Sequence, residues 1–262
     1  MGDRTMELRS LGKTGLQVSL IGFGAFKIGR NKGTKYSTEY ELPDRKDVFT
    51  LMDRLIDMGI NVIDTAPAYG VSEELIGAAL ARNGARSRIT LCTKVGETFD
   101  ASGSTYAYDR ESVNQSLDRS LSRLGTDCLD VVSVHSNGDD LRIIDQTDVL
   151  ETLERRRERG DLRHIGFSGK TSEGHLRALE HESDIEVLMV ELNPELTDQL
   201  EVVREAHRRS VGVLIKKGLG SGRVAPATAL PWLADLPEVS SIVIGSLSHS
   251  NMARNMELAR TS

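Results

Sequence analysis

The sequence predicts a single-domain α/β protein, a (β/α)8 TIM barrel with an N-terminal β-hairpin that takes up residues 1–262. Short apolar runs alternate with amphipathic segments along the whole chain, and eight strand-helix units can be counted if one shortened helix is included. The sequence shows no linker and no low-complexity stretch that would divide it. One closed barrel therefore explains the pattern better than an open, doubly wound sheet with two domains.

The predicted strands are short and rich in apolar residues. They lie at residues 16–22, 61–63, 89–93, 128–134, 163–167, 187–190, 211–215 and 241–244. The run at 128–134 is almost continuously apolar, as expected of a parallel strand buried on both faces.

The predicted helices carry apolar residues at helical spacing. These residues fall within 48–55, 75–80, 113–124, 149–153, 176–179, 200–206 and 230–236, and a last helix begins near residue 248. Asp109 and Ser172 are predicted N-caps, Ser72 marks another helix start, and Gly125 ends a helix. The longest irregular stretch, residues 31–47, is a candidate active-site loop.

Composition and charge argue against several kinds of partner. A net charge of −6 and a pI near 5.6 do not suit a protein that binds the phosphate backbone of a nucleic acid. No apolar run approaches the roughly 18 residues of a membrane span, and the N-terminus has no apolar signal core. We therefore expect a cytoplasmic protein, a monomer or small homo-oligomer, with neither nucleic acid nor membrane as partner.

The cysteines and histidines indicate no metal centre. Cys92 and Cys128 each lie in an apolar strand-like run, so buried free thiols are expected in place of a disulfide. The histidines show no metal-binding spacing.

Residues 61–70 are the most informative part of the chain. A short apolar run ends at Asp64, and Tyr69 follows after one tight turn that contains Pro67. A carboxylate and a phenol therefore lie on a strand-to-helix loop, where function concentrates in barrels.

Three consecutive strands end in ionisable residues. Asp64 ends the second strand, Lys94 the third and His135 the fourth. Since these strand ends meet at the C-terminal rim of a barrel, they are predicted to converge there with Tyr69. Each residue alone could have a structural role, as a turn cap, a buried lysine stem, a core histidine or a pocket wall. Together they predict a catalytic set.

This set of residues suits proton transfer to a carbonyl oxygen. The Lys94 ammonium is expected to favour the phenolate of Tyr69 and so to lower the pKa of the phenol, while Asp64 holds the ammonium by an ion pair. His135 can hydrogen-bond a substrate oxygen, and Tyr69 then acts as general acid. Because the carbonyl carbon must also receive an electron pair that no side chain supplies, a hydride cofactor is implied.

Ordered motifs along the chain carry a family resemblance. They are Leu-Gly-Lys-Thr-Gly-Leu-Gln-Val-Ser at 11–19, Asp-Thr-Ala-Pro-Ala-Tyr-Gly at 64–70, Thr-Lys-Val at 93–95, Leu-Asp-Val-Val-Ser-Val-His-Ser at 129–136 and Ile-Gly-Phe-Ser at 165–168. The chain resembles an aldo-keto reductase over essentially its whole length. The resemblance implies that Asp64, Tyr69, Lys94 and His135 are the catalytic tetrad of an enzyme that interconverts a carbonyl compound and an alcohol.

The same resemblance implies a nicotinamide cofactor bound extended across the barrel mouth. Ser168 and Asn193 would touch its carboxamide end, and loops at 220–222 and 245–246 would lie along the pyrophosphate and adenosine. The predicted cofactor contacts are Ser168, Asn193, Lys216, Leu219, Ser221, Gly222, Gly245, Ser246, Asn251 and Asn255.

The chain departs from the family pattern after the seventh strand. Lys216 and Lys217 stand where many members have an aromatic residue that stacks on the nicotinamide. One of these lysines could contact the pyrophosphate, or the two could form a solvated pair at a strand end. Both interpretations are open.

The choice between NADPH and NADH is also open. NADPH-selective relatives place a lysine before the serine and an arginine a few residues later to hold the 2′-phosphate, whereas this chain has Gly245 and Asn251. Arg254 lies nearby in a different helical phase. Family habit favours NADPH, with NADH as the alternative, and Asn255 matches the residue that contacts adenine.

The substrate is constrained only to a small carbonyl compound. Phe26 and Ser136 are candidate substrate contacts, and loops that carry Tyr36, Tyr40, Tyr106 and Tyr108 could line the pocket. An aromatic content of 4% favours small aldehydes, sugars or other polar carbonyls over the ligands of a deep aromatic cage.

Two other functions are kept as alternatives. The first is a cofactor-sensing regulatory subunit that keeps the reductase fold but turns over slowly, as some relatives do with membrane channels. The complete tetrad argues against it. The second is a Schiff-base lyase with Lys94 as nucleophile, which requires a depressed lysine pKa, whereas Asp64 should keep Lys94 charged.

Overall fold

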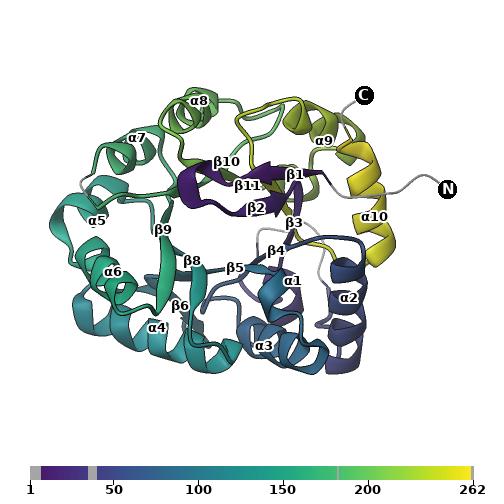
Figure 1. The fold of residues 1–262 in the computed structure, drawn as a ribbon, viewed down its shortest axis with the longest axis horizontal. Helices are drawn as coiled ribbons and strands as arrows, with labels where there is room; N and C mark the ends of the chain where they lie inside the picture. Colours follow the sequence, from purple (N-terminus) through teal and green to yellow (C-terminus); the bar gives the residue numbers. More distant parts are fainter. Residues whose placement is uncertain (1–6, 35–39, 182, 261–262) are drawn as a thin grey trace.

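The computed structural model describes residues 7–34, 40–181 and 183–260, and its architecture is the predicted one. Eight parallel strands close into a barrel in the order β10-β11-β12-β3-β4-β5-β8-β9, and β9 pairs with β10 to complete the circle. Helices surround the barrel on the outside (Figure 1). The prediction of a (β/α)8 barrel with an N-terminal hairpin is therefore confirmed.

The barrel strands alternate with outer helices along the described chain. The barrel strands are β3 (Ile21–Gly24), β4 (Val62–Asp64), β5 (Thr90–Val95), β8 (Leu129–His135), β9 (Leu162–Ser168), β10 (Val187–Glu191), β11 (Gly212–Lys216) and β12 (Ser241–Ile244). The outer helices are α2 (Arg45–Asp57), α3 (Ser72–Asn83), α4 (Arg110–Leu124), α6 (Val149–Glu158), α7 (Ser172–Glu180), α8 (Leu200–Arg208), α9 (Pro226–Ala234) and α10 (His249–Leu258). Every residue of β5 is buried, because the barrel interior covers one face and the helices cover the other.

The predicted first strand at 16–22 is wrong in its boundaries, because two strands share this stretch. β2 (Gln17–Ser19) pairs antiparallel with β1 (Leu8–Ser10) in the hairpin, and β3 then enters the barrel. The chain turns between them at Ser19, whose Oγ donates to the Ile21 carbonyl at 2.8 Å. The apolar pattern runs through both strands, so no break is visible in the sequence.

Two predicted helix caps have different outcomes. Asp109 caps α4 as predicted, because its side chain accepts a hydrogen bond from the Ser112 N–H at 3.0 Å. For α7 the predicted cap, Ser172, is wrong. Thr171 takes this position, its hydroxyl accepts from the Gly174 N–H at 3.0 Å, and Ser172 is the first helical residue.

Several short elements were not predicted. They are α1 (Phe26–Gly29), α5 (Asp140–Gln146), the hairpin of β6 (Glu97–Asp100) and β7 (Gly103–Tyr106), and 3₁₀ turns at Gly12–Thr14, Arg86–Arg88 and Gly220–Gly222. The β6–β7 hairpin is polar on both strands and largely exposed, so no apolar period reveals it. Within the predicted loop at 31–47, α2 already begins at Arg45, and residues 35–39 lie outside the described part of the chain.

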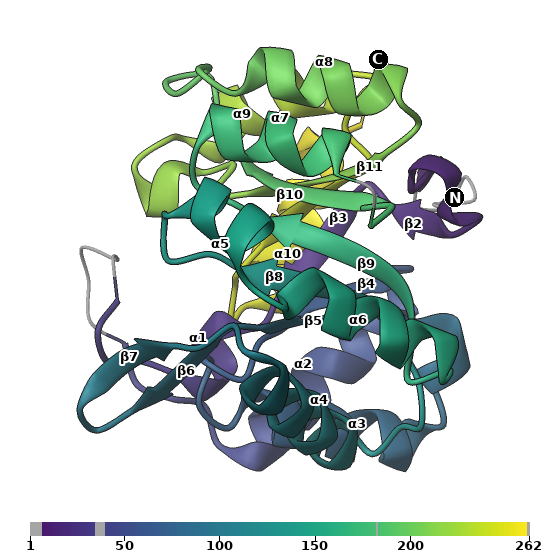
Figure 2. The same cartoon turned by 90° about the vertical axis from the view of Figure 1, so that its left-hand side faces the viewer.

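The two ends of the barrel are built differently. At the N-terminal ends of the strands, the β1–β2 hairpin and the turn after it cover the interior, and Leu11 is fully buried there. Leu11 packs on the backbone at Gly212, where an added Cβ would approach Leu11 Cδ1 within 2.6 Å. The β6–β7 hairpin lies at the opposite end (Figure 2). The C-terminal strand ends are therefore the end available to a ligand.

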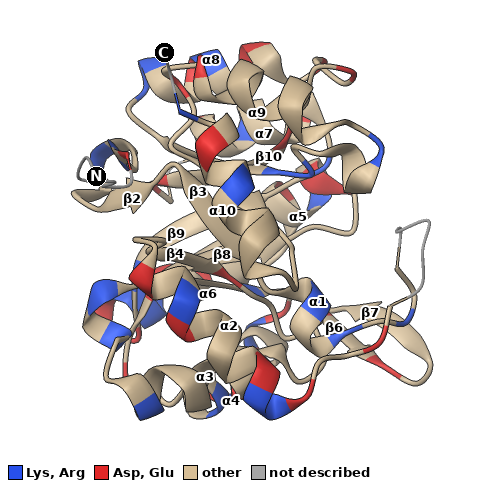
Figure 3. Ribbon diagram, turned by 90° about the vertical axis from the view of Figure 1, so that its right-hand side faces the viewer, with Lys and Arg blue, Asp and Glu red and all other residues tan. Residues whose placement is uncertain are grey.

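The surface and the cysteines can be compared with the sequence expectations. Basic and acidic residues are interspersed along the outer helices in the view of Figure 3. Among the described residues, no helix has the length and apolar character needed to cross a membrane. Both cysteines are free thiols; Cys92 is buried as expected, whereas Cys128 is only partly buried because it precedes β8. Within the described ranges, no cluster of three or more His, Cys, Asp or Glu is arranged to hold a metal ion.

Helices α3 and α4 pack closely because Gly77 has no side chain. A Cβ at Gly77 would lie 2.3 Å from the Arg123 carbonyl oxygen. We predict that Gly77→Ala lowers the free energy of unfolding by about 1–3 kcal/mol, because the two helices must move apart. Urea unfolding measures this change, and Ala81→Gly on the exposed side of α3 is the control, with an expected loss below about 1 kcal/mol. An unchanged midpoint for Gly77→Ala would contradict the close packing.

Candidate active site

Four predicted side chains meet at the open end of the barrel. Asp64 is the last residue of β4, Lys94 the penultimate residue of β5 and His135 the last residue of β8. Tyr69 comes from the turn between β4 and α3, and all four line one cavity of about 520 Å³, here called the mouth cavity. The structure thus brings the predicted set together, while the catalytic role of its members stays a prediction.

The turn that carries Tyr69 is fixed by close backbone packing. The Tyr69 N–H donates to the Ala66 carbonyl at 2.9 Å. Gly70 has a φ of 61°, and a Cβ at Gly29 of α1 would approach the Tyr69 carbonyl oxygen within 2.1 Å. The ring of Phe26, also in α1, packs edge-to-face on the Tyr69 ring with a centroid distance of 5.0 Å. The unpredicted helix α1 therefore positions the phenol.

Lys94 and Asp64 form a buried ion pair beside this phenol. Lys94 Nζ donates to Asp64 Oδ1 at 2.6 Å and to the Thr65 carbonyl at 2.8 Å, and it lies 5.0 Å from the centroid of the Tyr69 ring. Burial lowers the pKa of Lys94, but the attraction of the Asp64 carboxylate and other neighbours outweighs it and raises the pKa above its ordinary value. Lys94 is therefore an ammonium at neutral pH.

The predicted lowering of the Tyr69 pKa is wrong. Burial of the phenol has the largest effect and raises its pKa to about 12, although the Lys94 ammonium acts in the opposite direction. The Asp64 carboxylate adds to the rise. At neutral pH Tyr69 is a protonated phenol, which can donate a proton but cannot take one up.

His135 is paired with a carboxylate that the sequence analysis missed. Its Nδ1 lies 2.9 Å from Oε2 of Glu97, the first residue of β6. The approach is not linear and no other described residue hydrogen-bonds Nδ1, so the contact is mainly electrostatic. Burial raises the pKa of Glu97, but its interactions with His135 and Ser104 outweigh burial and lower the pKa to about 2. Burial also lowers the pKa of His135, so a carboxylate faces a neutral imidazole at neutral pH.

Other charged residues complete the wall of the mouth cavity. The Arg30 guanidinium stacks on the Phe99 ring, 3.3 Å from its centroid, and lies 3.8 Å from Glu97. Glu191 ends β10 and Glu97 lies two residues beyond β5, so the strand-end rule would have found both. Arg30 directly follows α1 and has no comparable signal in the sequence.

Only some of the candidate substrate contacts line the mouth cavity. Phe26 and Ser136 line the mouth cavity, as does Tyr106 from β7, whereas Tyr40 and Tyr108 lie outside it. Tyr36 lies outside the described residues. Ser136 is held by a hydrogen bond from its Oγ to the buried Asp140 carboxylate, which also accepts from the backbone of the loop after β9.

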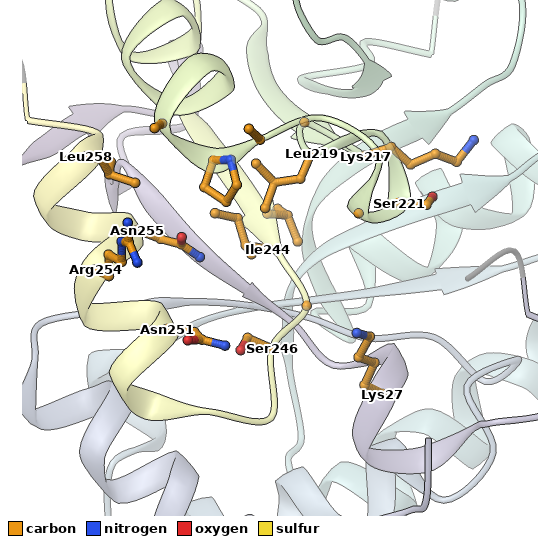
Figure 4. Close-up of a pocket in the computed structure, with 17 residues that line it drawn as sticks. Lys27, Lys217, Leu219, Ser221, Ile244, Ser246, Asn251, Arg254, Asn255 and Leu258 are labelled. Carbon is orange, nitrogen blue, oxygen red and sulfur yellow. The ribbon is translucent and has the colours of Figure 1, made fainter. Parts of the chain in front are cut away.

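A second cavity of about 560 Å³, here called the side cavity, lies between the loops after β11 and β12 and helix α10 (Figure 4). Its predicted lining residues are Leu219, Ser221, Gly222, Gly245, Ser246, Asn251 and Asn255. Three basic residues, Lys27, Lys217 and Arg254, also line it, and none of its described lining residues is acidic. Figure 4 shows Arg254 on α10 at one side and Lys217 across the cavity. A lining of this charge suits phosphate groups.

The two cavities adjoin each other, and together they are here called the furrow. Lys217, Ser221, Val243 and Gly245 border both of them. The ionisable set lies at one end of the furrow and the basic lining at the other, which suits an elongated ligand with a reactive end and an anionic end. Asn193 lines neither cavity, and its Nδ2 instead donates to the Lys217 carbonyl at 3.4 Å.

Lys216 and Lys217 are not a solvated pair, so that interpretation is wrong. Lys216 Nζ donates to Ser168 Oγ at 3.0 Å and to the Gly169 carbonyl at 2.7 Å in the wall of the mouth cavity. Lys217 forms an ion pair with Glu191, and its φ of 53° is unusual for a residue with a side chain. Burial, with a contribution from the charge of Lys217, lowers the pKa of Lys216 to about 7.

Fold and site together define a class of protein. A (β/α)8 barrel whose mouth joins a phenol, an ammonium, a carboxylate and an imidazole is the layout of a carbonyl oxidoreductase. The chain belongs to the aldo/keto reductase family, whose family model matches residues 20–229. Members of this family are generally NAD(P)H-dependent carbonyl reductases.

Individual relatives agree with this assignment. A putative aldo-keto reductase from Pseudomonas aeruginosa is 35% identical, with a TM-score of 0.89 over 99% of this chain and 97% of that chain. L-galactose dehydrogenase from Arabidopsis thaliana is 28% identical over 256 residues, which are 93% of this chain and 75% of the relative. Aldo-keto reductase YhdN from Bacillus subtilis is 34% identical over 165 residues, 62% of this chain and 47% of the relative. The chain thus spans three quarters of one of these curated relatives and about half of the other.

The buried amine of Lys216 gives a prediction about stability and pH. Its native pKa of about 7 lies below the ordinary value of 10.5, so between these values the native protein binds fewer protons than the unfolded chain. The free energy of unfolding of the wild type should therefore rise, relative to that of Lys216→Met, as the pH increases from about 7 to about 10. The advantage of the variant should be greatest below about pH 7.

Urea unfolding of both proteins across this pH range measures the difference. Lys46→Met, at an exposed position of α2, is the matched control and should show no such slope. A stability difference between Lys216→Met and wild type that does not vary with pH would contradict the assignment of a depressed amine pKa.

Proposed function

We propose that the protein is an NAD(P)H-dependent oxidoreductase that reduces an aldehyde or ketone to an alcohol, or catalyses the reverse reaction. The observation that carries the proposal is the protonated phenol of Tyr69, held beside the Lys94–Asp64 pair in a mouth cavity that adjoins the basic side cavity.

Tyr69 is the proposed general acid. Its pKa of about 12 keeps the proton on the phenol at neutral pH, and the Lys94 ammonium favours the phenolate that forms as the proton leaves. Asp64 holds Lys94 in place for this role. The nicotinamide cofactor, when bound, supplies the hydride for the carbonyl carbon.

The side cavity is the proposed place for the phosphates and adenosine of the cofactor. Lys27 and Arg254, together with the absence of acidic residues from its described lining, support phosphate binding there, whereas the ammonium of Lys217 is paired with Glu191. Ser168 lines the mouth cavity and accepts a hydrogen bond from Lys216, so both are proposed to hold the nicotinamide end.

NADPH is the proposed cofactor, with NADH as the alternative. Arg254 projects from α10 into the lining of the side cavity beside Asn251 and Asn255 (Figure 4). A guanidinium suits a 2′-phosphate because its planar fork matches two phosphate oxygens. Arg254 would thus take the part that the family pattern gives to the position of Asn251.

Small polar carbonyl compounds and sugars are the proposed substrates. The mouth cavity has charged and hydroxyl-bearing walls from Arg30, Glu97, Ser104 and Lys170, which favour polar ligands. The relative named L-galactose dehydrogenase acts, by its name, on a sugar. We further propose that the protein works in the cytoplasm as a monomer or small homo-oligomer.

The alternatives have weaker support. A Schiff-base lyase needs a neutral amine, whereas Lys94 is charged and donates to Asp64 and Thr65. A regulatory subunit would use the same furrow, and it differs from the leading proposal only in lacking turnover. Borohydride trapping of a substrate on a lysine would support the lyase, and tight cofactor binding without turnover would support the regulatory subunit.

The proposed general acid can be tested by Tyr69→Phe. We expect kcat for the reduction of a small aldehyde to fall by at least ~10²-fold, because the proton donor is lost. The Kd for NADPH should stay within about threefold, because Tyr69 does not line the side cavity. Absorbance of NADPH and its fluorescence on binding measure the two quantities.

Tyr40→Phe is the matched control, because Tyr40 does not line the mouth cavity and its hydroxyl donates to a backbone carbonyl, that of Arg30. Turnover by Tyr69→Phe at the wild-type rate would remove the proposed general acid. A wild-type protein that binds neither NADPH nor NADH would sink the oxidoreductase proposal as a whole.

The proposed 2′-phosphate contact can be tested by Arg254→Ala. We expect the Kd for NADPH to rise about tenfold, because a charge-assisted contact is lost, and the Kd for NADH to change by less than about twofold. Asn251→Arg should strengthen NADPH binding by restoring the cation of the family pattern. Fluorescence titration with each cofactor gives these values, and an equal weakening of both cofactors by Arg254→Ala would assign Arg254 to the pyrophosphate instead.

A further inference from the structure

Lys216 is held in the wall of the mouth cavity by neutral partners. Its Nζ donates to Ser168 Oγ at 3.0 Å and to the Gly169 carbonyl at 2.7 Å. Lys94 and Lys217, in the same cavity, each form an ion pair with a carboxylate, whereas Lys216 forms none with a described residue. The contacts of Lys216 therefore do not require a positive charge on its amine.

Two carboxylates favour a charged Lys216, but each is paired elsewhere. Glu191, at the end of β10, forms an ion pair with Lys217. Asp140, in α5, accepts hydrogen bonds from Ser136 and from the backbone of the loop after β9. Both act on Lys216 only from a distance, so neither holds a proton on its amine.

The other groups that face Lys216 disfavour its positive charge. Burial has the largest effect and lowers the pKa of the amine, and the cations Lys217 and Lys94 contribute to a final value of about 7. The imidazoles of His135 on β8 and His175 on α7 also interact with the charge of Lys216, and burial lowers the pKa of both rings. About half of the Lys216 amine is therefore neutral near pH 7.

A neutral Lys216 amine keeps its lone pair for a ligand. Nζ is bonded to Cε and donates its two N–H groups to the two oxygens, so the lone pair takes the remaining tetrahedral direction. The side chain lines the mouth cavity, and Lys216 is the only residue of β11 that is not fully buried. A small carbonyl compound in this cavity of about 520 Å³ is therefore within reach of the amine.

We propose that Lys216 forms a reversible imine with small aldehydes in the cofactor-free protein. The Nζ lone pair attacks the carbonyl carbon, and the π electron pair of the C=O bond moves to the oxygen. The resulting carbinolamine then forms a C=N bond, while the oxygen leaves as water with the two protons of the amine. The step needs neither an oxidant nor a reductant. A desolvated lysine beside another cation is a suitable nucleophile for this reaction.

This site differs from the lyase site considered above, where Lys94 would be the nucleophile. Lys94 is an ammonium that donates to Asp64, so it has no free lone pair. Ser168 and Lys216 are also proposed to hold the nicotinamide end of the cofactor, so the imine and the cofactor should exclude each other. This exclusion rests on the proposed function, whereas formation of the imine does not.

Reductive trapping with propanal and sodium cyanoborohydride tests the proposal on the wild-type protein without cofactor. Peptide mass spectrometry gives the initial rate of alkylation at each lysine near pH 7. We expect Lys216 to react at least ~10-fold faster than Lys46, an exposed residue of α2, because a larger fraction of its amine is neutral. Equal rates at the two residues, or a fast adduct on Lys94 in place of Lys216, would overturn the proposal.

The pH dependence of the same rates tests the state of the amine. Between about pH 6 and about pH 8, the neutral fraction of an amine with a pKa of about 7 rises about tenfold, whereas that of an ordinary lysine rises about a hundredfold. The rate at Lys216 relative to that at Lys46 should therefore fall about tenfold as the pH rises. The effect of pH on the reductant cancels, since both rates come from one sample. A constant ratio would contradict a neutral amine.

Lys216→Arg keeps a positive charge but removes the nucleophilic amine, so its intact mass should show no fast adduct. Lys46→Arg is the matched control and should gain the adduct as the wild type does. A fast adduct in Lys216→Arg at the wild-type rate would assign the reaction to another amine and overturn the proposal.

Protection by cofactor separates the imine from the proposed function. In Tyr69→Phe, chosen because it should consume little aldehyde, NADPH at about ten times its Kd should slow alkylation of Lys216 about tenfold and leave Lys46 unchanged. If bound NADPH gives no protection, the imine stands and the place proposed for the nicotinamide end fails. If Lys216 reacts fast but the wild type binds no nicotinamide cofactor, the oxidoreductase proposal fails while the imine site stands.

Discussion

The ion pair between Lys94 and Asp64 is the interaction on which the mouth of the barrel depends. It joins neighbouring strands β4 and β5 at 2.6 Å, where both side chains are almost fully buried. Either charge alone would be costly in this place, and removal of one partner would leave the other uncompensated. The second hydrogen bond of the ammonium, to the Thr65 carbonyl, ties the pair to the turn that leads to Tyr69. The position of the phenol therefore depends on this pair.

Charged residues are paired differently in the two cavities of the furrow, so its two ends differ in charge. In the mouth cavity Lys94 faces Asp64 and Lys217 faces Glu191, whereas Lys216 hydrogen-bonds only neutral oxygens and has a depressed pKa. In the side cavity every charged residue of the described lining is basic. One end of the furrow is therefore built to hold protons at defined atoms, and the other to attract an anion.

The sequence could predict the elements that have a regular spacing of apolar residues, and the site residues that stand at the end of an apolar strand. Asp64, Lys94 and His135 are recognisable because an apolar run stops at or beside each of them. Arg30 could not be placed, because its position is set by α1. With four residues, α1 is too short to show a helical spacing of apolar residues in the sequence. The direction of the Tyr69 pKa shift was missed for a physical reason. A sequence indicates which charges become neighbours, but it does not show how much water the fold removes from the phenol.

Leu11 packs against Gly212 and closes the N-terminal end of the barrel, and this packing has a consequence for how the protein can evolve. This apolar seal holds the strands from below, remote from every loop that borders the furrow. A descendant of this chain can lengthen, shorten or exchange a loop at the mouth while its foundation stays intact. A new substrate specificity can thus arise through changes in these loops, while the residues that stabilise the other end of the barrel stay the same.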